Sequence, residues 1–340
     1  MFALAALAAT GAFAQSSVTL SGVLDFSYAT ISGNGTTADT KLNTVSSTGQ
    51  TSAISSINLH AVEDLGGGLK GEMRYEIDPR ANANGGAAFG RHQVFVGASG
   101  GFGAVKLGAP NAASLQAFLA SSPLGTGIGS AFSLSDNSAV TVNTVRYSNS
   151  VRYDTPSFSG FGASVTHAPG NDDATKGGAA PAITNLGLTY SNGPLNVVFS
   201  SLQTSATGAQ VAVATTATAI GTAAVDARVK GTFNYLAANY ALGNAKVFVG
   251  YGDGDKSTTT GLDTKVSRVG ASYTMGAVTL IGQYATTEIG TAAKRKTTGL
   301  RADYALSKRT AAYFGYEAYD SGAATANKTN IAAVGVRHAF

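Results

Sequence analysis

The feature that most constrains the fold of this chain is a strict alternation of apolar and charged residues within short segments. In the segment LKGEMRYEID, residues 69–78, the apolar residues Met73, Tyr75 and Ile77 stand between charged neighbours. Successive side chains of a β-strand point to opposite faces, so this spacing predicts a strand with one apolar and one charged face. The alternation recurs in residues 151–154, 246–251, 267–273 and 299–306. A Tyr or Phe repeatedly stands near a strand end on the apolar face, where an aromatic girdle would lie.

The connections between these predicted strands alternate in length. Short turns occupy residues 65–69, 99–103, 157–162, 191–194, 242–245, 275–277 and 306–309. Longer polar segments are centred near residues 40, 84, 126, 175, 215, 258, 291 and 324. Seven short turns and eight long loops join sixteen strands and leave both chain ends on the short-turn side. This sorting is typical of a bacterial outer-membrane barrel, whereas a soluble sandwich has no reason to sort its loops.

The two ends of the chain fit such a barrel. Residues 334–340 alternate and finish on an outward aromatic, Phe340, which suits a final strand that pairs with the first strand and removes the sheet edge. The apolar run before residue 15 ends in Ala12-Phe13-Ala14, the small-x-small form of a secretory cleavage site. We therefore expect a signal peptide over residues 1–14 and a barrel over residues 15–340.

The N-terminal run lacks the basic start of a complete signal peptide. No Lys or Arg precedes it, which points to a translation start upstream of Met1. A short buried helix is the alternative, and the run is too short to span a bilayer as a helix, which takes about 20 apolar residues.

Composition excludes several classes of function. The absence of Cys rules out disulfides, thiolate metal sites and Cys nucleophiles, and 43 Gly argue against a helical enzyme. Lys and Arg are spread thinly, so we expect no nucleic-acid partner. No catalytic motif or metal-ligand spacing of His occurs, so we expect no enzymatic activity, no cofactor and no metal. Asp253, Asp255 and Asp263 in one loop leave a divalent-cation site open, although the spacing of an EF-hand is missing.

Six blocks together resemble the general diffusion porins of β-proteobacteria, with gaps at the loops. They are QSSVTLSGVLDF, VEDLGGGLKGE, FVGASGGFGAVKLG, NSVRYDTPSFSGFG, ALSKRTAAYFGY and VGVRHAF, between Gln15 and Phe340. The resemblance implies a sixteen-stranded antiparallel barrel in the outer membrane, among lipid and lipopolysaccharide. It also implies a homotrimer, a third loop folded into the pore as a constriction, and passive diffusion of small hydrophilic solutes and ions.

The third loop is expected from Pro110 to Thr144 and is unusually apolar. Leu115, Phe118, Leu119 and Phe132 would be odd on an exposed tip, so we expect them to pack against the inner barrel wall. An ordinary mobile loop is the alternative.

The sequence departs from the family at three basic positions. Ser56, His92 (with Arg91 beside it) and Ala109 stand about where relatives often carry Arg, whereas Arg152 is retained and Arg146 lies on the same face. Three of the family's basic positions are therefore weakened.

Alternation places more basic than acidic residues on the inner face. The basic set is Lys70, Arg74, Lys106, Arg146, Arg152, Lys246, Arg268, Arg301 and Arg337; the acidic set is Glu72, Glu76, Asp78, Asp154 and Asp303. A basic wall around a narrow aqueous pore favours anions, so we expect mild anion selectivity, which Asp136 in the third loop would partly offset. The expected pore-lining or constriction residues are Lys70, Arg74, His92, Lys106, Asp136, Arg146, Arg152 and Arg301. For each charge, a local ion pair without effect on conduction is the alternative.

Two other functions compete with the pore. A non-conducting surface protein would use the barrel only to anchor adhesive loops, but it needs neither an apolar third loop nor charged inner faces. A barrel enzyme would need a Ser, a His and an acid on one wall. The inward His60 and the His at position 92 have no evident partner set of this kind.

Overall fold

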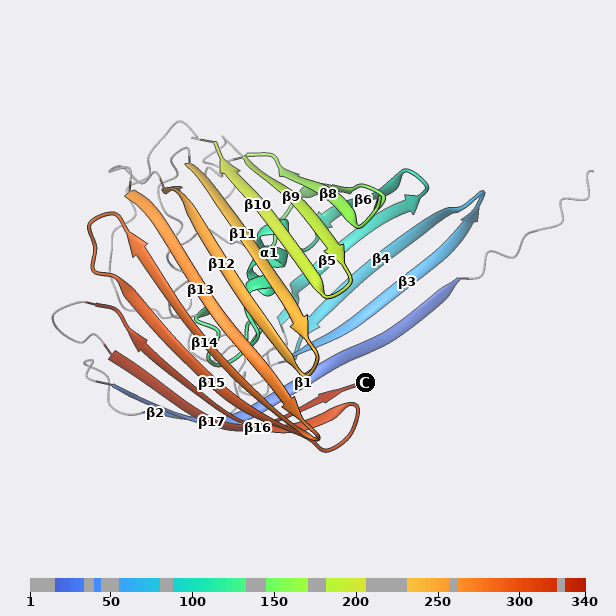
Figure 1. Ribbon diagram of the computed structural model, residues 1–340. Helices are drawn as coiled ribbons and strands as arrows, with labels where there is room; N and C mark the ends of the chain where they lie inside the picture. The colour runs from blue at the N-terminus through green and yellow to red at the C-terminus, as the bar shows by residue number, and fades with distance from the viewer. Residues whose placement is uncertain are drawn as a thin grey trace, which may run out of the picture.

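The described residues form one closed ring of antiparallel strands with a short helix inside it (Figure 1). The computed structural model describes residues 16–33, 40–43, 55–79, 88–132, 145–170, 182–205, 231–256, 262–322 and 328–340. The strands are β1 (Ser17–Gly33), β2 (Thr40–Asn43), β3 (Ser56–Gly66), β4 (Leu69–Asp78), β5 (Ala88–Gly100), β6 (Gly103–Ala109), β7 (Ser150–Asp154), β8 (Phe161–Ala168), β9 (Ile183–Asn192), β10 (Leu195–Thr204), β11 (Gly231–Leu242), β12 (Ala245–Lys256), β13 (Leu262–Met275), β14 (Val278–Ile289), β15 (Arg295–Ala305), β16 (Thr310–Asp320) and β17 (Lys328–Ala339). The helix is α1 (Ala113–Ser121). The predicted signal peptide lies outside the described residues.

The ring closes between the first and last strands. β1 pairs with β17 from Val23↔Ala339 to Gly33↔Thr329, and the backbones of Gly22 and Phe340 exchange two hydrogen bonds of 3.0 Å. On its other edge β1 pairs with β3 at one end and β2 at the other, so β2 and β3 share one position in the ring. The barrel is therefore sixteen-stranded, as predicted, and the pairing of β1 with β17 closes the sheet on itself.

All seven predicted short turns join strands, and one of them shows why Gly is needed. Gly66, Gly67 and Gly68 between β3 and β4 all have positive φ angles, +86°, +62° and +80°, which L side chains rarely adopt. No atom lies within 4 Å of where a Cβ would stand on any of the three, so backbone conformation and not space selects Gly.

The predicted positions and lengths of the long loops are partly wrong. The segment near residue 40 contains β2, and the connections near residues 258 and 291 are short because the strands continue into them. β12 runs on to Lys256 and β13 begins at Leu262, with Asp253 directly opposite Lys265. Opposite charges facing each other across two strands stabilise pairing, so polar composition alone does not mark a loop.

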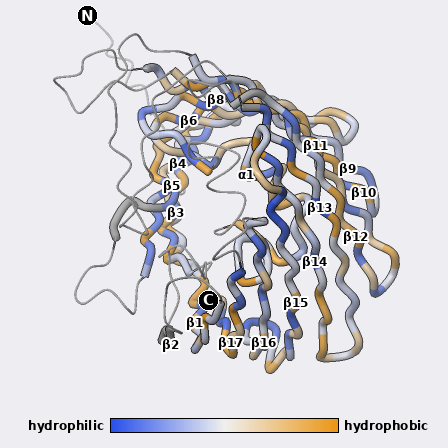
Figure 2. Tube along the Cα trace, turned by 90° about the vertical axis from the view of Figure 1, so that its left-hand side faces the viewer, coloured by the Kyte–Doolittle hydropathy of each residue, from blue (hydrophilic) through white to orange (hydrophobic). Residues whose placement is uncertain are grey.

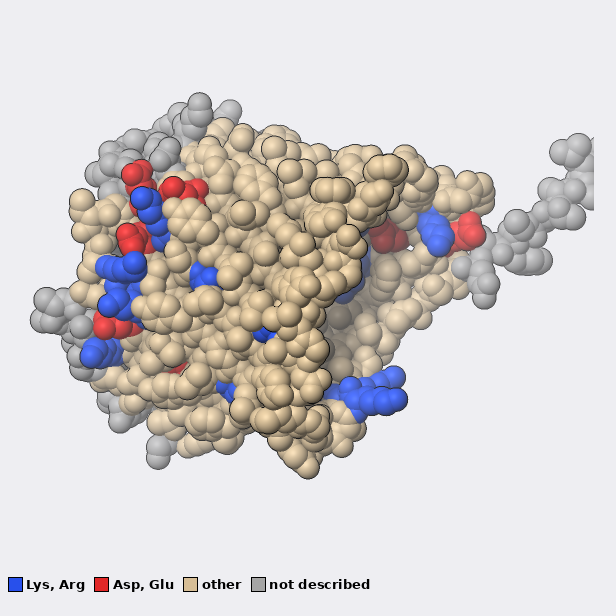
Figure 3. All heavy atoms as spheres, viewed as in Figure 1, with Lys and Arg blue, Asp and Glu red and all other residues tan. Residues whose placement is uncertain are grey.

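The outer face of the barrel is apolar. In β12 the alternate residues Val247, Val249 and Tyr251 are exposed, whereas Phe248 between them is buried. The face in Figure 3 is largely free of charged side chains across its middle, and charges gather toward the strand ends. So extended an exposed apolar surface is unsuited to water, and it matches the lipid-facing band of a membrane barrel. Among the described residues, no helix has the length and apolar character needed to cross a membrane.

The third loop folds inward. Figure 2 shows α1 inside the ring, beside the wall that includes β11 and β13. Leu115 and Phe118 of α1 are buried, and Ala117 and Ala120 join a buried apolar cluster with residues of β10, β11 and β13. Leu119 is an exception: it is 41% exposed and does not pack against the wall, because it stands on the helix face turned away from it.

Candidate functional site

Wall side chains hold both ends of α1. The Asn185 Oδ1 atom on β9 accepts a 3.0 Å hydrogen bond from the Ser114 backbone N–H, one of the donors a helix start leaves unpaired. At the other end, Asn239 on β11 donates from Nδ2 to the Ala120 carbonyl at 2.8 Å. Asn185 is fully buried and also donates to the Ser200 hydroxyl at 2.9 Å. The helix is therefore fixed against the wall through its backbone.

The outgoing and returning ends of the third loop lie against each other. The Ala112 N–H donates to the Val145 carbonyl at 2.8 Å, and Asn111 forms an isolated bridge with Arg146. Tyr147 is buried beneath α1, with its hydroxyl 3.3 Å from that of Ser114. Burial raises the pKa of Tyr147, because the phenolate would lose its hydration there.

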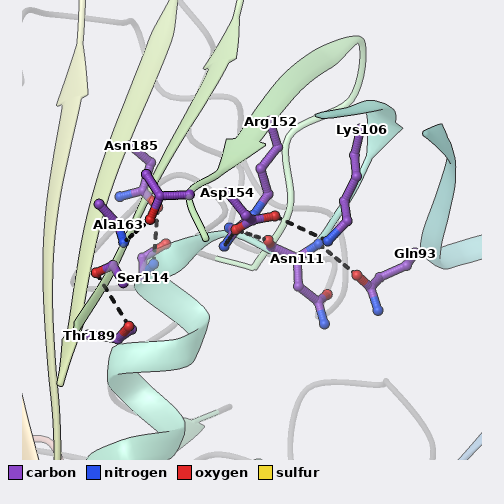
Figure 4. A network of polar contacts seen from close by, with 11 residues as sticks. Gln93, Lys106, Asn111, Ser114, Arg152, Asp154, Ala163, Asn185 and Thr189 are labelled. Carbon is purple, nitrogen blue, oxygen red and sulfur yellow. Dashed lines mark hydrogen bonds and ion pairs between the residues drawn. The ribbon is translucent and has the colours of Figure 1, made fainter. Parts of the chain in front are cut away.

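A polar network joins this loop entry to β6 and β7 (Figure 4). Arg152 donates to the Asn111 carbonyl at 2.8 Å and to the Asp154 Oδ1 atom from Nη2 at 2.6 Å and from Nε at 2.9 Å. Lys106 reaches the other Asp154 oxygen at 3.1 Å, and Arg146 donates to the Asn111 Oδ1 atom at 2.9 Å. Asp154 thus carries two basic partners, and Arg152 is only 3% exposed.

The same network continues to β4 and β5. The Asn111 N–H donates to the Gln93 Oε1 atom at 3.0 Å, and Gln93 Nε2 donates to the Glu76 Oε1 atom at 2.9 Å. Arg74 Nε binds the same oxygen at 2.6 Å. We call this connected set the Asn111 network; it consists of Arg74, Glu76, Gln93, Lys106, Asn111, Arg146, Arg152 and Asp154. It brings together four of the eight residues expected from the sequence.

Basic side chains on the inner face recur with an acid two residues later on the same strand. The pairs are Arg74–Glu76 at 2.6 Å, Arg152–Asp154 at 2.6 Å and Arg301–Asp303 at 2.5 Å. Residues i and i+2 of a strand share a face, which allows these contacts. The two opposite charges of each pair largely cancel at a distance. The number of basic residues on the wall therefore overstates the positive field in the pore.

The other four expected residues lie apart from the network. Arg301 sits across the barrel on β15, 4.2 Å above the Tyr313 ring. Lys70 is exposed beside the β3–β4 turn, opposite Asp64. His92 is half-buried where the β4–β5 register shifts, and Gln93 beside it reaches the network. Asp136 lies outside the described residues.

Sequence reasoning missed several polar residues of the interior. Gln93 and Asn111 link the network, and the buried acids Asp25 and Glu317 were not counted on the inner face. Asp25 accepts a 2.7 Å hydrogen bond from the Tyr313 hydroxyl, and Glu317 accepts one from the Gly129 N–H. Alternation could have found the two acids; nothing in the sequence distinguishes Gln93 or Asn111 from other loop and strand amides.

No group of His, Asp or Glu suited to a metal ion occurs in the part of the chain that the structure describes. Of the three loop aspartates that left a cation site open, Asp253 and Asp263 are exposed on facing strands β12 and β13. The side chain of Asp255 is outside the described set.

A closed, lipid-facing barrel with a loop folded inside and a charged inner wall defines a membrane channel. The chain belongs to the Gram-negative porin family, whose model matches residues 2–324. It is 31% identical over 374 residues to the outer membrane porin protein 32 of Delftia acidovorans, covering 100% of this chain and 99% of that one. It is 30% identical over 321 residues to an outer membrane porin protein of Bordetella pertussis, covering 83% and 81%. The protein is therefore an outer-membrane porin, a channel for passive diffusion.

Solved structures share the fold. The anion-selective porin from Comamonas acidovorans superposes with a TM-score of 0.78 at 24% identity, covering 96% of this chain and 100% of that chain. The trimer form of OmpT from Vibrio cholerae gives a TM-score of 0.65 at 17% identity, covering 96% and 99%.

Proposed function

We propose that this porin is a water-filled diffusion channel with a mild preference for small anions. The observation that carries the proposal is the Asn111 network at the entry of the inward loop. There Arg74 pairs with Glu76, and Lys106 and Arg152 both pair with Asp154. Arg146 donates to the Asn111 amide oxygen, so four basic side chains stand beside two carboxylates of the network. Basic groups that outnumber acids beside a narrow passage favour anions. The anion-selective porin that shares this fold supports the same preference.

Within this proposal the eight residues expected from the sequence have unequal roles. Arg74, Lys106, Arg146 and Arg152 supply the local field at the loop entry, and Arg301 adds to it from the opposite wall. Lys70 at the turn contributes little, because its charge is exposed to bulk solvent and is screened beyond about 8 Å at physiological salt. Burial lowers the pKa of Arg146, while the charges of Glu76 and Asp78 raise it in part, so this guanidinium keeps its charge.

The test is reconstitution of the refolded protein, from Gln15 onward, in a planar bilayer under a KCl gradient. A zero-current potential displaced toward the equilibrium potential of chloride supports the proposal. The preference for chloride should weaken as the salt concentration rises. Channels that prefer potassium would keep the pore and overturn the anion preference. Folded protein that does not conduct at all would instead support the alternative of a barrel that only anchors surface loops.

We also propose that the protein is a homotrimer, with lipid and lipopolysaccharide around the rest of its apolar outer face. The trimer form of OmpT, which shares the fold, supports this assembly. Conductance that rises in groups of three equal steps, together with a native mass of three chains, is the expected result. A native mass of one chain in mild detergent, with single independent steps, would contradict it.

A further inference from the structure

A row of four residues crosses the inner wall beneath the end of the described part of the third loop. Gly270 on β13 is the direct register partner of Gln283 on β14, Gln283 of Gly299 on β15, and Gly299 of Glu317 on β16. All four therefore lie at one level on four neighbouring strands and share the inner face. We call Gly270, Gln283, Gly299 and Glu317 the loop seat.

The two glycines of the loop seat let the loop backbone approach the wall. A Cβ on Gly270 would stand 2.7 Å from the Pro123 Cγ atom, and a Cβ on Gly299 would stand 1.9 Å from the Gly129 carbonyl oxygen. Neither Gly270 nor Gly299 has a positive φ angle, so the requirement is for space alone. Even the methyl group of Ala would displace the loop at Gly299, because the obstacle is backbone and not a flexible side-chain end.

The two polar residues of the loop seat hold the loop where the glycines admit it. Gln283 accepts from the Ser122 hydroxyl at 2.9 Å and donates from Nε2 to the Ser130 carbonyl at 2.9 Å. Glu317 Oε2 accepts from the Gly129 N–H at 2.6 Å. Gln283 and Glu317 are both buried, so removing either would leave a buried loop partner without its hydrogen bond, which is unfavourable.

The loop itself is bent to fit the loop seat. Gly129 has a φ angle of +89° and Ala131 one of +65°, an unusual conformation for a residue with a side chain. The backbone between them presents the Gly129 N–H to Glu317 and the Ser130 carbonyl to Gln283. Surrounding contacts must determine such a conformation, and the loop seat supplies them.

We propose that the loop seat fixes how far the third loop stands from the wall and thereby sets the calibre of the pore. Its four members are positioning residues: they touch the loop and act on solutes only through it. This inference rests on the proposed function, in which the inward loop narrows the channel. Along the row, the glycines let the loop backbone come close to the wall, and the hydrogen-bonding side chains between them attach it there.

Gly299→Ala is the first test, with Gly282→Ala as its matched control. Gly282 is the neighbour of Gln283 on β14, but it faces outward, and a Cβ there would meet only the Leu300 Cδ2 atom at 3.6 Å. Unit conductance and the exclusion of graded neutral polyethylene glycols are measured in 1 M KCl, where the screening length of about 3 Å suppresses charge effects. Folding is checked by heat-modifiable electrophoretic mobility.

The added methyl should push the loop by roughly 1 Å or more into the lumen. G299A is expected to show a unit conductance lower by roughly 1.5-fold and to exclude smaller polymers, while G282A matches the unsubstituted protein. Folded G299A with unchanged conductance and polymer exclusion would overturn the loop seat. If the unsubstituted protein itself does not conduct, the proposed function fails and this inference with it.

Glu317 provides a second test that does not depend on G299A folding. Glu317→Ala removes the acceptor for Gly129, and we expect frequent transitions between conductance levels as the loop loosens. Glu317→Gln keeps an oxygen acceptor of the same reach, so it should restore most of the steady conductance that E317A loses. Steady, full conductance in folded E317A would overturn the loop seat. Equal instability in both variants would likewise contradict it, because the hydrogen bond would then not be what holds the loop.

Discussion

The guanidinium of Arg152 on β7 donates a 2.8 Å hydrogen bond to the backbone carbonyl of Asn111, two residues beyond the end of β6. Arg152 therefore holds the first residues of the inward loop in addition to carrying a charge. A substitution at this position should alter both the path of the loop and the field in the pore. The two effects can be separated because Lys keeps the charge but cannot reproduce the guanidinium's several donors.

Arg152→Gln should shift the zero-current potential toward potassium and add conductance sublevels. Arg152→Lys should keep the ion preference yet still add sublevels, because the bond to Asn111 or that to Asp154 is lost. Both are measured in single-channel records under a KCl gradient. Lys70→Gln, which removes a charge of the same sign beside a turn, is the control and should change neither property. If neither Arg152 variant shows conductance sublevels, Arg152 does not hold the start of the inward loop in place.

Removing the shared acid should strengthen the anion preference. Asp154→Asn leaves Arg152 and Lys106 without the carboxylate that both contact, at 2.6 Å and 3.1 Å. We expect the chloride-to-potassium permeability ratio to rise by roughly two-fold at low salt, since a charged wall concentrates its counter-ions.

Asp303→Asn removes the carboxylate that pairs with one basic side chain, Arg301, and is compared with Asp154→Asn, which affects two. Its effect should have the same sign and be smaller. A shift toward potassium in either variant would contradict the assignment of these pairs to the conducting face.

A charge placed on the outer face should destabilise the barrel. Val249 lies at the middle of β12 and is 52% exposed. Val249→Arg should lower the free energy of unfolding from lipid vesicles by about 2–4 kcal/mol, because an arginine at the bilayer midplane is poorly solvated. Leu306→Arg, in the turn between β15 and β16, should cost about 0–1 kcal/mol. Denaturant titration followed by Tyr fluorescence measures both, and equal costs would show that Val249 does not face lipid.

Removing the helix anchor should loosen the loop without opening the barrel. Asn185→Ala leaves the Ser114 N–H and the Ser200 hydroxyl without their bonds to a buried amide. A loss of about 1–3 kcal/mol is expected for a buried donor left unpaired. Thr184→Ala, one residue away on the outward face, is the control, because the Thr184 hydroxyl bonds to the exposed His167 ring at 3.0 Å and not to α1. Hydrogen exchange of the α1 amides should rise in N185A alone.

Alternation predicted the fold well because it is local. Met73 and Tyr75 indicate a two-faced strand without reference to any other part of the chain, and Gly67 indicates a turn because of its own backbone. The count of strands followed from these local signals. The lengths of the outer loops did not, because polar residues such as Asp253 can extend a strand when a partner of opposite charge faces them.

The site was less predictable because it depends on distant contacts. The two-residue alternation of the strand predicts that Arg152 faces inward. It does not predict that the Arg152 guanidinium donates to Asp154 and to the Asn111 carbonyl. The loop seat is a sharper case: Gly270 and Gly299 are two among 43 glycines, and only strand register places them beneath Pro123 and Gly129. Register is a property of pairs of strands, so one strand read alone does not contain it.

The seam between Gly22 and Phe340 has a consequence for how the chain matures. These backbones are the two ends of the ring, so the bonds that close it join residues separated by almost the whole sequence. Contacts of such long range form slowly, since a large loop of chain must be ordered first. Until β17 docks on β1, the sheet keeps two unpaired edges able to capture another strand. Before this seam forms, the chain therefore carries two edges open to intermolecular pairing, and closing the ring removes both at once.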